Sequence, residues 1–290
     1  MIVRTTTRFV LCTIGSLLVG VSHQALGQTC EPSTSSNEAK IFGNRSLALA
    51  AGRGAPVAAD PAGTIRAGVE FVMLPHVSDA TATPTTCRPG KGPENVNALP
   101  GVARASVSAS LGAGITATLR WLPPVTLSGM RGNLLSVAAG YTRGVLPGVA
   151  FEARAYATFG NVTGPITCPD DAVRDPASEC HNGTRSSDRF DPNIRGIDIA
   201  AGGRAHGAGL AWYGGAGYES LTPRFQVHFL NAAGFLDTTR VRVDLTRVTL
   251  FAGASWTPWS RTRLTGEVFA TPDDGATVRV VVDTPLWRLW

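Results

Sequence analysis

From Gly63 to its end, the chain alternates apolar and polar residues with a period of two, in stretches of about eight to twelve residues. In one such stretch, Ile65, Ala67, Val69, Phe71 and Met73 alternate with polar or small residues. This alternation is typical of a β-strand whose two faces meet different surroundings, and helical periodicity is hardly visible. The sequence therefore predicts an all-β fold.

We predict eleven strands, joined by short turns and by two long polar loops at Pro75–Pro100 and Asn161–Asn193. They are expected at 64–74, 103–111, 115–122, 134–142, 149–160, 195–204, 208–218, 224–230, 239–257, 262–271 and 276–284. The stretch 44–52 is a candidate for a twelfth strand, or for a helix. In the 239–257 segment the apolar parity switches, which predicts a β-bulge near Thr246–Arg247.

Composition excludes two broad classes of protein. Of the 290 residues, 43% are hydrophobic and 16% are charged, whereas an average soluble domain has about 25% charged residues. A disordered chain needs the opposite balance. The longest apolar run, Phe9–Val21, is shorter than the roughly twenty residues of a spanning helix, which argues against a helical membrane protein.

The N-terminus has the pattern of a secretory signal peptide. Arg4 and Arg8 precede the apolar run, and small residues at Ala25 and Gly27 follow it. We expect a signal peptide over residues 1–27 and an N-terminal extension over residues 28–62. The remaining chain is only mildly basic, and its arginines are scattered singly, so we expect no nucleic-acid partner.

Four cysteines remain after the expected cleavage: Cys30, Cys87, Cys168 and Cys180. An even set in an exported protein indicates disulfide bonds, and four cysteines allow three connectivities. Proximity in the sequence favours Cys168 with Cys180, which leaves Cys30 with Cys87. The spacing does not resemble that of a zinc site, and we expect neither a metal nor a cofactor.

Strand parity places most of the charges of the strands on one face. Positive and negative charges nearly balance there, which favours a network of ion pairs inside a narrow lumen. The predicted lumen charge ladder consists of Arg66, Glu70, Arg104, Arg120, Glu152, Arg154, Asp198, Arg204, Arg242, Asp244, Glu267, Arg279 and Asp283. Aromatic residues near the predicted strand ends, where interfacial girdles lie, are Trp121, Tyr141, Phe159, Trp212, Tyr218, Trp256 and Trp259.

A signal peptide, amphipathic strands, alternating short and long connections and a final aromatic residue, Trp290, together resemble a bacterial outer-membrane β-barrel protein. The resemblance is to an architectural class and covers residues 63–290. It implies a transmembrane antiparallel up-and-down β-barrel of about ten to twelve strands in the bacterial outer membrane, in contact with its lipid. It also implies recognition by the barrel assembly machinery through a C-terminal strand that ends at Trp290.

The predicted function is structural, or passive transport of a small solute or apolar compound. Paired lumen charges would set solute selectivity in an open channel and would plug a closed one. One alternative is an outer-membrane hydrolase that uses loop residues, with candidates His76, His181, Asp170, Asp171 and Asp188. Another is a secreted soluble β-sandwich or adhesin. Since no established catalytic motif occurs, we assign no catalytic residue.

Overall fold

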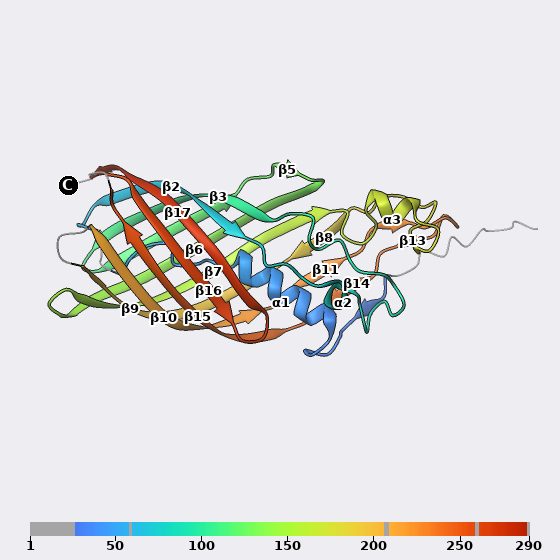
Figure 1. The fold of residues 1–290 in the computed structure, drawn as a ribbon, viewed down its shortest axis with the longest axis horizontal. Helices are drawn as coiled ribbons and strands as arrows, with labels where there is room; N and C mark the ends of the chain where they lie inside the picture. The colour runs from blue at the N-terminus through green and yellow to red at the C-terminus, as the bar shows by residue number, and fades with distance from the viewer. Residues whose placement is uncertain (1–26, 58–59, 206–208, 259–260, 289–290) are drawn as a thin grey trace, which may run out of the picture.

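The computed structural model describes residues 27–57, 60–205, 209–258 and 261–288, so nearly all of the predicted signal peptide lies outside the described residues. None of the described helices has the length and apolar character needed to cross a membrane. Most of the described chain forms strands that close into a barrel (Figure 1).

Ten antiparallel strands form the barrel, and β17 closes it by pairing with β2. In order around the wall, they are β2 (Thr64–Met73), β3 (Gly101–Gly112), β4 (Ile115–Leu122), β6 (Met130–Leu146), β7 (Val149–Gly164), β9 (Ile194–Arg204), β10 (Leu210–Leu221), β15 (Leu245–Trp256), β16 (Arg263–Thr271) and β17 (Gly275–Arg288). The number lies within the predicted ten to twelve, and the closed barrel contradicts the alternative of a soluble sandwich. β17 continues past Pro285 to Arg288 through a register shift, while Trp290 lies outside the described residues.

One of the eleven expected strands, and the 44–52 stretch left open as a strand or a helix, do not belong to the barrel wall. The predicted 224–230 strand consists of two short pieces at the long-loop end, β11 (Arg224–Gln226) and β12 (Phe229–Leu230). The 44–52 stretch belongs largely to the helix α1 (Asn37–Leu49), whose N-terminus is capped by the Ser36 hydroxyl accepting from Ala39 N. These differences explain why the sequence yields an odd count where a barrel of this class has an even one.

Beyond the barrel, at the end that carries the long loops, the sheet continues as an extension on one side (Figure 1). In it, the end of β7 pairs with β8, β8 with β11, β11 with β14, and β14 with β1. The remaining short elements are β1 (Thr29–Cys30), β5 (Thr126–Leu127), β8 (Asp188–Asp191), β13 (Leu236–Asp237), β14 (Arg240–Arg242), α2 (Asp79–Ala82) and α3 (Asp170–Arg174).

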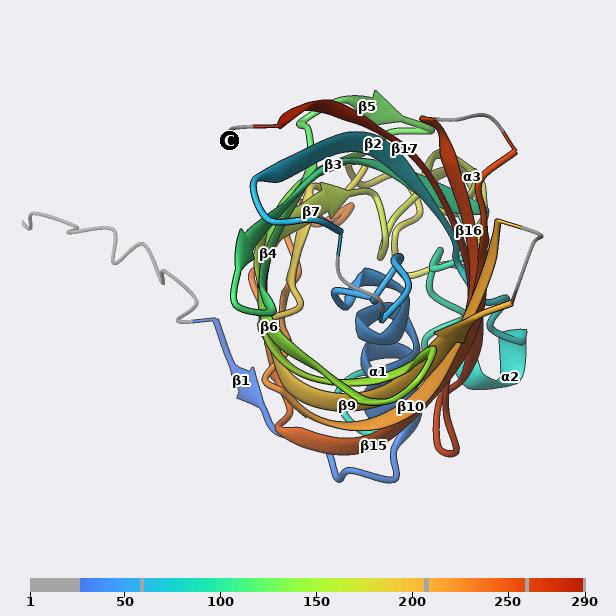
Figure 2. The same cartoon turned by 90° about the vertical axis from the view of Figure 1, so that its left-hand side faces the viewer.

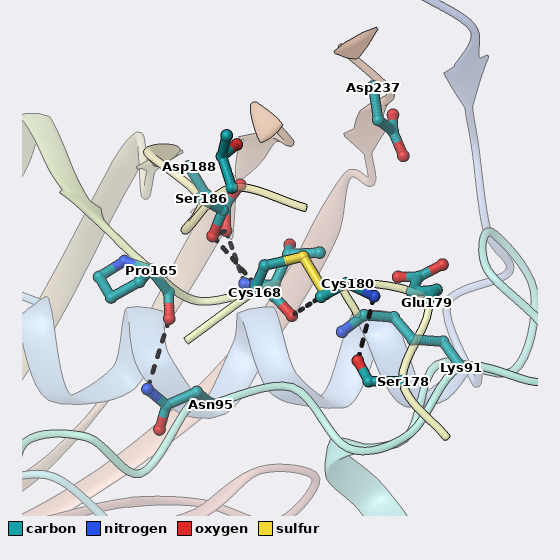
Figure 3. The surroundings of a disulfide bond; sticks show 12 residues. Lys91, Asn95, Pro165, Cys168, Ser178, Glu179, Cys180, Ser186, Asp188 and Asp237 are labelled. Atoms are coloured by element: carbon teal, nitrogen blue, oxygen red, sulfur yellow. Dashed lines mark hydrogen bonds between the residues drawn. A yellow bond between two sulfur atoms is a disulfide. The ribbon is translucent and has the colours of Figure 1, made fainter. Parts of the chain in front are cut away.

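Both disulfides that the sequence favours are present, Cys30–Cys87 and Cys168–Cys180. The first fixes the N-terminal segment to the β2–β3 loop, and the second closes a small loop between β7 and β8. Figure 3 shows the surroundings of Cys168–Cys180, where Cys168 N donates to the Ser186 hydroxyl at 3.0 Å. The long loops are therefore held to the extension covalently as well as by hydrogen bonds.

Two registered rows of residues mark the level at which this wall enters the membrane. In the upper row, Ile194, Leu221 and Leu245 are directly paired, and each is at most 3% exposed. Three residues further along each strand, toward the short turns, the apolar residues lie on the outside, at 50% exposure or more: Ile197, Tyr218 and Val248. Above this level the apolar face covers α1, and below it the apolar face meets lipid.

The predicted β-bulge near Thr246–Arg247 is wrong. Alternate residues keep one inward parity through the whole segment, and the β10–β15 register is continuous from Leu221–Leu245 to Leu210–Trp256. The inward residues are Val241, Val243, Leu245, Arg247, Thr249 and Phe251. The apolar residues change parity because they lie on the inward face, against α1, above the membrane boundary and on the outward face, against lipid, below it. The backbone itself continues without a bulge.

Aromatic side chains follow the two edges of this apolar outer surface. Those toward the long loops are Trp121, Phe159 and Tyr218, and those toward the short turns are Tyr141, Trp212 and Trp256. Each of the six is exposed by about half, as interfacial residues of a barrel are. Trp259 lies outside the described residues.

The N-terminal segment fills the lumen. Viewed along the barrel, α1 lies inside the ring of strands (Figure 2). Its Phe42 side chain packs against Phe190 and Phe225 of the extension, with ring centroids 5.5 and 6.0 Å apart. From the C-terminus of α1 the chain continues through the buried residues 50–54 to β2, which begins at the short-turn end. We refer to residues 37–57 as the plug.

Candidate functional site: a plugged lumen and an apolar cavity

Arginines of the barrel wall hold the plug by its backbone carbonyls. Arg104 donates to Leu49 O and Ala50 O at 2.9 and 3.2 Å, and Arg154 donates to Ala51 O and Gly52 O at 2.9 and 2.7 Å. Two further arginines donate to carbonyls of the plug, Arg279 to Leu47 O and Arg120 to Arg53 O. Carbonyls at a helix C-terminus have no intrahelical partner and carry partial negative charge, so guanidinium groups are suitable partners for them.

Carboxylates of the wall complete the contacts of the plug. Glu267 accepts hydrogen bonds from Arg53 N and Gly54 N, both at 3.1 Å. The Arg53 side chain binds Glu152 at 2.5 Å and Asp198 at 2.7 Å. An irregular segment in a barrel interior needs partners for its backbone groups, and here charged side chains of the wall supply many of them.

Wall charges also pair with one another. Glu70 binds Arg104 at 2.7 Å and Arg120 at 3.2 Å, while Asp283 pairs with both Arg66 and Arg263. Ten of the thirteen residues of the predicted ladder are buried inside the barrel, five positive and five negative: Arg66, Arg104, Arg120, Arg154, Arg279, Glu70, Glu152, Asp198, Glu267 and Asp283. Many of these charged side chains therefore pair with each other or bind the plug.

Three residues of the predicted ladder do not lie in the lumen. Arg204 is exposed at the short-turn end of β9. Arg242 and Asp244 belong to the extension, on its outer face, where they approach Glu31 and Arg224 at 3.6 and 2.9 Å. Above the membrane boundary the outward face of a strand meets water instead of lipid. Polar residues at alternate positions there therefore lie on the outer surface and not in the lumen.

Several buried charges of the lumen were absent from the predicted ladder: Arg53, Glu219, Arg247, Arg263 and Asp274. Arg53 belongs to the N-terminal extension, where no strand pattern indicates a face. Its only signal in the sequence is that it stands alone among small residues between Ala50 and Ala55. Arg247 and its partner Asp274, 2.6 Å apart, lie where a bulge was expected and in the β16–β17 turn.

An apolar cavity of about 110 Å³ lies beside the plug at the long-loop end. The helix α1 supplies Ile41, Phe42 and Leu49, and the β2–β3 loop supplies Val96 and Leu99. Strand residues on the other sides of the cavity include Val102, Met130, Val162, Phe190, Phe225 and Val241. The cavity is thus bounded by the plug, the barrel wall and the extension together.

Charged residues at the edge of the cavity have partners elsewhere. Glu38 accepts from Thr86 N and Cys87 N, both at 2.8 Å; burial opposes its ionisation, but these backbone bonds hold the Glu38 pKa below its ordinary value. Arg45 donates to Pro75 O at 3.0 Å and to Asn97 Oδ1 at 2.9 Å, and burial lowers its pKa to about 10. The charged side chains at the edge are therefore bound to other groups, and the interior of the cavity is lined by apolar side chains.

Glu94, also at the edge of the cavity, is different. Burial raises its pKa to about 7, although the Lys91 ammonium lies 2.6 Å away. Protonation there would remove a charge from the edge of the cavity.

The loop residues proposed for hydrolysis do not form a catalytic arrangement among the described residues. His76 is exposed, and the Nδ1 atom of His181 is buried with no partner among the described residues. Asp170 pairs with Arg185, while Asp188 accepts from Thr167 N and His228 N at 2.6 and 2.9 Å and so serves the loop structure (Figure 3). Within the described part of the chain, no three His, Cys, Asp or Glu residues converge as metal ligands.

Comparisons with known proteins concern architecture. No family model and no curated protein matches the sequence. Among solved structures, Ail of Yersinia pestis matches 77% of this chain and 95% of its own, at 8% identity and a TM-score of 0.29. The translocator domain of the autotransporter NalP from Neisseria meningitidis matches 79% of this chain and 90% of its own, at 9% and 0.34. The P. putida toluene transporter TodX matches 91% and 74%, at 11% and 0.33.

The architecture rests on the geometry of this chain. A closed antiparallel sheet with an apolar outer surface, charges inside, short turns at one end and long loops at the other is an outer-membrane β-barrel. The sequence prediction of this class, and of its location in the outer membrane, is confirmed. In such proteins the long loops lie outside the cell and the short turns face the periplasm, so the cavity lies toward the outer surface.

Proposed function

We propose that this barrel takes up a small apolar compound from the outer surface, with the cavity as its binding site and the plug as a gate. The cavity carries the proposal. Its volume of about 110 Å³ compares with roughly 150 Å³ for an engineered apolar cavity in another protein that takes up benzene. A compound of up to about the size of benzene is therefore the ligand class that the cavity fits.

Cavity and gate share the same helix. Ile41, Phe42 and Leu49 line the cavity, and Leu49 is also the last residue of α1, whose carbonyl accepts from Arg104. A ligand that binds more tightly when α1 is displaced would increase the population of barrels with an open lumen. The size of this shift is set by the difference in affinity between the two states. Displacement of residues 50–54 would break their bonds to the wall. We therefore expect the barrel without ligand to be closed.

Binding is tested with fluorobenzene as the probe. The purified full-length protein, folded in lipid nanodiscs, is titrated while the ¹⁹F resonance of the probe is recorded. Nanodiscs without protein correct for partition into lipid. We expect saturable binding, which Val241→Phe should abolish because the larger side chain fills the cavity.

Val243→Phe is the matched control, since Val243 lies on the same inward face, is equally buried and does not line the cavity. Retention of folding in both variants is checked by the mobility shift of an unheated sample in gel electrophoresis. Equal binding by wild type and Val241→Phe, or the absence of saturable binding in wild type, would contradict the proposal.

We also propose that insertion depends on the C-terminal strand. The outward residues of β17 include Val278, Val280 and Val282, each about 40% exposed, and β17 ends at Arg288, two positions before Trp290 in the sequence. Such a strand suits recognition by the barrel assembly machinery. Deletion of Trp290 should lower the amount of heat-modifiable barrel in the outer membrane, and an unchanged amount would contradict this role.

A further inference from the structure

Arginines gather on the outer face of the wall directly above the apolar surface. Arg195 of β9 lies on the outward face and pairs in register with Ser220 of β10, which pairs in turn with Thr246 of β15. Arg195 is two residues above the exposed Ile197. Further from the membrane, Arg224 of β11 pairs in register with Arg242 of β14. Arg195 thus lies on the outward face of the barrel strand β9, and Arg224 and Arg242 lie on the outer face of the extension.

A second row crosses five neighbouring strands. In register, Arg131 of β6 is followed by Thr163, Arg189, Gln226 and finally Arg240 of β14. Arginines alternate with residues that carry neutral hydrogen-bonding groups, so successive guanidinium groups are roughly 10 Å apart at their bases, twice the spacing between strands. We name the six outward arginines of these rows the arginine face: Arg131, Arg189, Arg195, Arg224, Arg240 and Arg242.

Carboxylates compensate only part of this charge. Arg189 pairs with Asp191 at 2.8 Å, Arg224 with Asp244 at 2.9 Å, and Arg242 approaches Glu31 at 3.6 Å. The side chains of Arg189 and Arg242 remain about half exposed. Among the described residues, no carboxylate lies within ion-pair distance of Arg131, Arg195 or Arg240. The face is therefore positive and open to solvent.

We propose that the arginine face binds the phosphate groups of anionic lipid in the outer leaflet. Its position decides the class of partner, because exposed apolar residues of the lipid-facing surface lie a short way below its lower members. On β9, Ile197 is two residues below Arg195, and on β6, Leu135 is four residues below Arg131. Lipid head groups therefore lie at the height of Arg195 and Arg131. A guanidinium group matches phosphate through two parallel N–H···O bonds, and it retains its charge at every physiological pH.

The test uses lipid A, a diphosphorylated glycolipid, against the same lipid after enzymatic removal of its phosphates. The full-length protein in mixed micelles is titrated with each, and bound lipid is counted by native mass spectrometry. We expect wild type to retain the phosphorylated form, with binding that weakens as salt is raised. The triple variant Arg131→Gln/Arg189→Gln/Arg240→Gln should bind it roughly a hundredfold more weakly.

The control variant is Arg143→Gln/Arg204→Gln, which removes two exposed arginines near the short turns and should bind like wild type. Replacing the three arginines of the row by lysine should restore much of the binding, because the positive charge is retained. Equal retention of the dephosphorylated lipid, or equal loss in the control variant, would overturn the proposal. Displacement of the lipid by millimolar inorganic phosphate would also overturn it, by showing a site for free phosphate.

Discussion

Arg53 of the plug donates to Asp198 of the barrel wall across 2.7 Å, and the side chains are only 3% and 1% exposed. The same guanidinium binds Glu152. A residue from the N-terminal segment thus ties two strands, β7 and β9, to the middle of the lumen. The charges that the sequence suggests for a channel lining serve here to bind the segment that fills the lumen.

Arg53→Met should weaken this closure. Loss of the guanidinium leaves Glu152 and Asp198 with fewer partners in a buried site, which costs about 3–5 kcal/mol of stability. We expect a lower urea midpoint of unfolding and frequent openings in planar-bilayer recordings, in which we expect wild type to be silent. Arg185→Met is the control: it breaks a surface pair with Asp170, worth up to about 1 kcal/mol, and should leave the recordings unchanged. A silent Arg53→Met barrel would contradict the gate.

Gly52→Val should have a related effect through shape. A β-carbon at Gly52 would collide with Arg279 Nη1 and lie 2.6 Å from Glu267 Oε1, so the plug can approach the wall closely only with glycine here. We expect increased conductance, or faster proteolysis of the plug, relative to wild type. Gly266→Val is the comparison within the barrel wall, since a β-carbon there meets nothing within 4 Å. Similar behaviour of the two variants would show that the contact at Gly52 is unimportant.

The two disulfides should differ in their contribution to stability. In the chain-entropy account, a cross-link across the 57-residue separation of Cys30 and Cys87 contributes about 4 kcal/mol, against about 3 kcal/mol for the separation of 12 between Cys168 and Cys180. Replacing each pair by serine should therefore lower the free energy of unfolding more for Cys30/Cys87. Hydrogen exchange should also show opening of α1 in that variant alone, because the bond anchors the outer end of the plug.

The β2–β3 loop should respond to pH through Glu94. Its pKa in the folded protein, about 7, lies above the ordinary value of 4.5, so between these values the folded state binds the proton more tightly than the unfolded state. The loop is consequently most stable below pH 4.5, loses stability as the pH rises through this window, and changes little above pH 7. The protection of residues 91–97 against hydrogen exchange, taken relative to the intrinsic exchange rate at each pH, should fall across the window. In Glu94→Gln this fall in protection should disappear, and its persistence there would exclude Glu94 as the source.

The position of the membrane boundary can be tested on a single strand. Thr246 and Leu250 lie on the same outward face of β15, on opposite sides of Val248. Leu250→Arg should cost about 2–4 kcal/mol, because it places a charge against lipid tails, whereas Thr246→Arg should cost about 1 kcal/mol or less. Refolding into lipid vesicles at a series of urea concentrations measures both. Equal costs would place the boundary elsewhere.

Alternation of apolar and polar residues was sufficient to predict the class of fold. Ile197 and Ile199, or Val278 and Val280, mark strands with an apolar face, and the low charge content fits a surface in contact with lipid. Proximity of cysteines also identified Cys168–Cys180, and Cys30–Cys87 followed as the remaining pair. These features are local, so they can be deduced from the spacing along the chain.

Other features depend on which segments lie opposite one another. The sequence placed Arg242 and Asp244 in the lumen, since parity cannot show where a strand leaves the membrane. It indicated no partner for Arg53, because nothing near residue 53 shows that side chains from five strands, β4, β7, β9, β15 and β16, would contact it.

The sequence by itself determined that the chain forms amphipathic strands with charges on one face. Only the tertiary structure decided that the N-terminal segment occupies the space those charges enclose. The physical reason is that charges in a closed lumen, and the backbone groups of an irregular segment inside it, must find partners at short distance. In this protein the charged residues of the wall and the backbone groups of the plug are partners for one another. These contacts exist only once the barrel has closed around the plug.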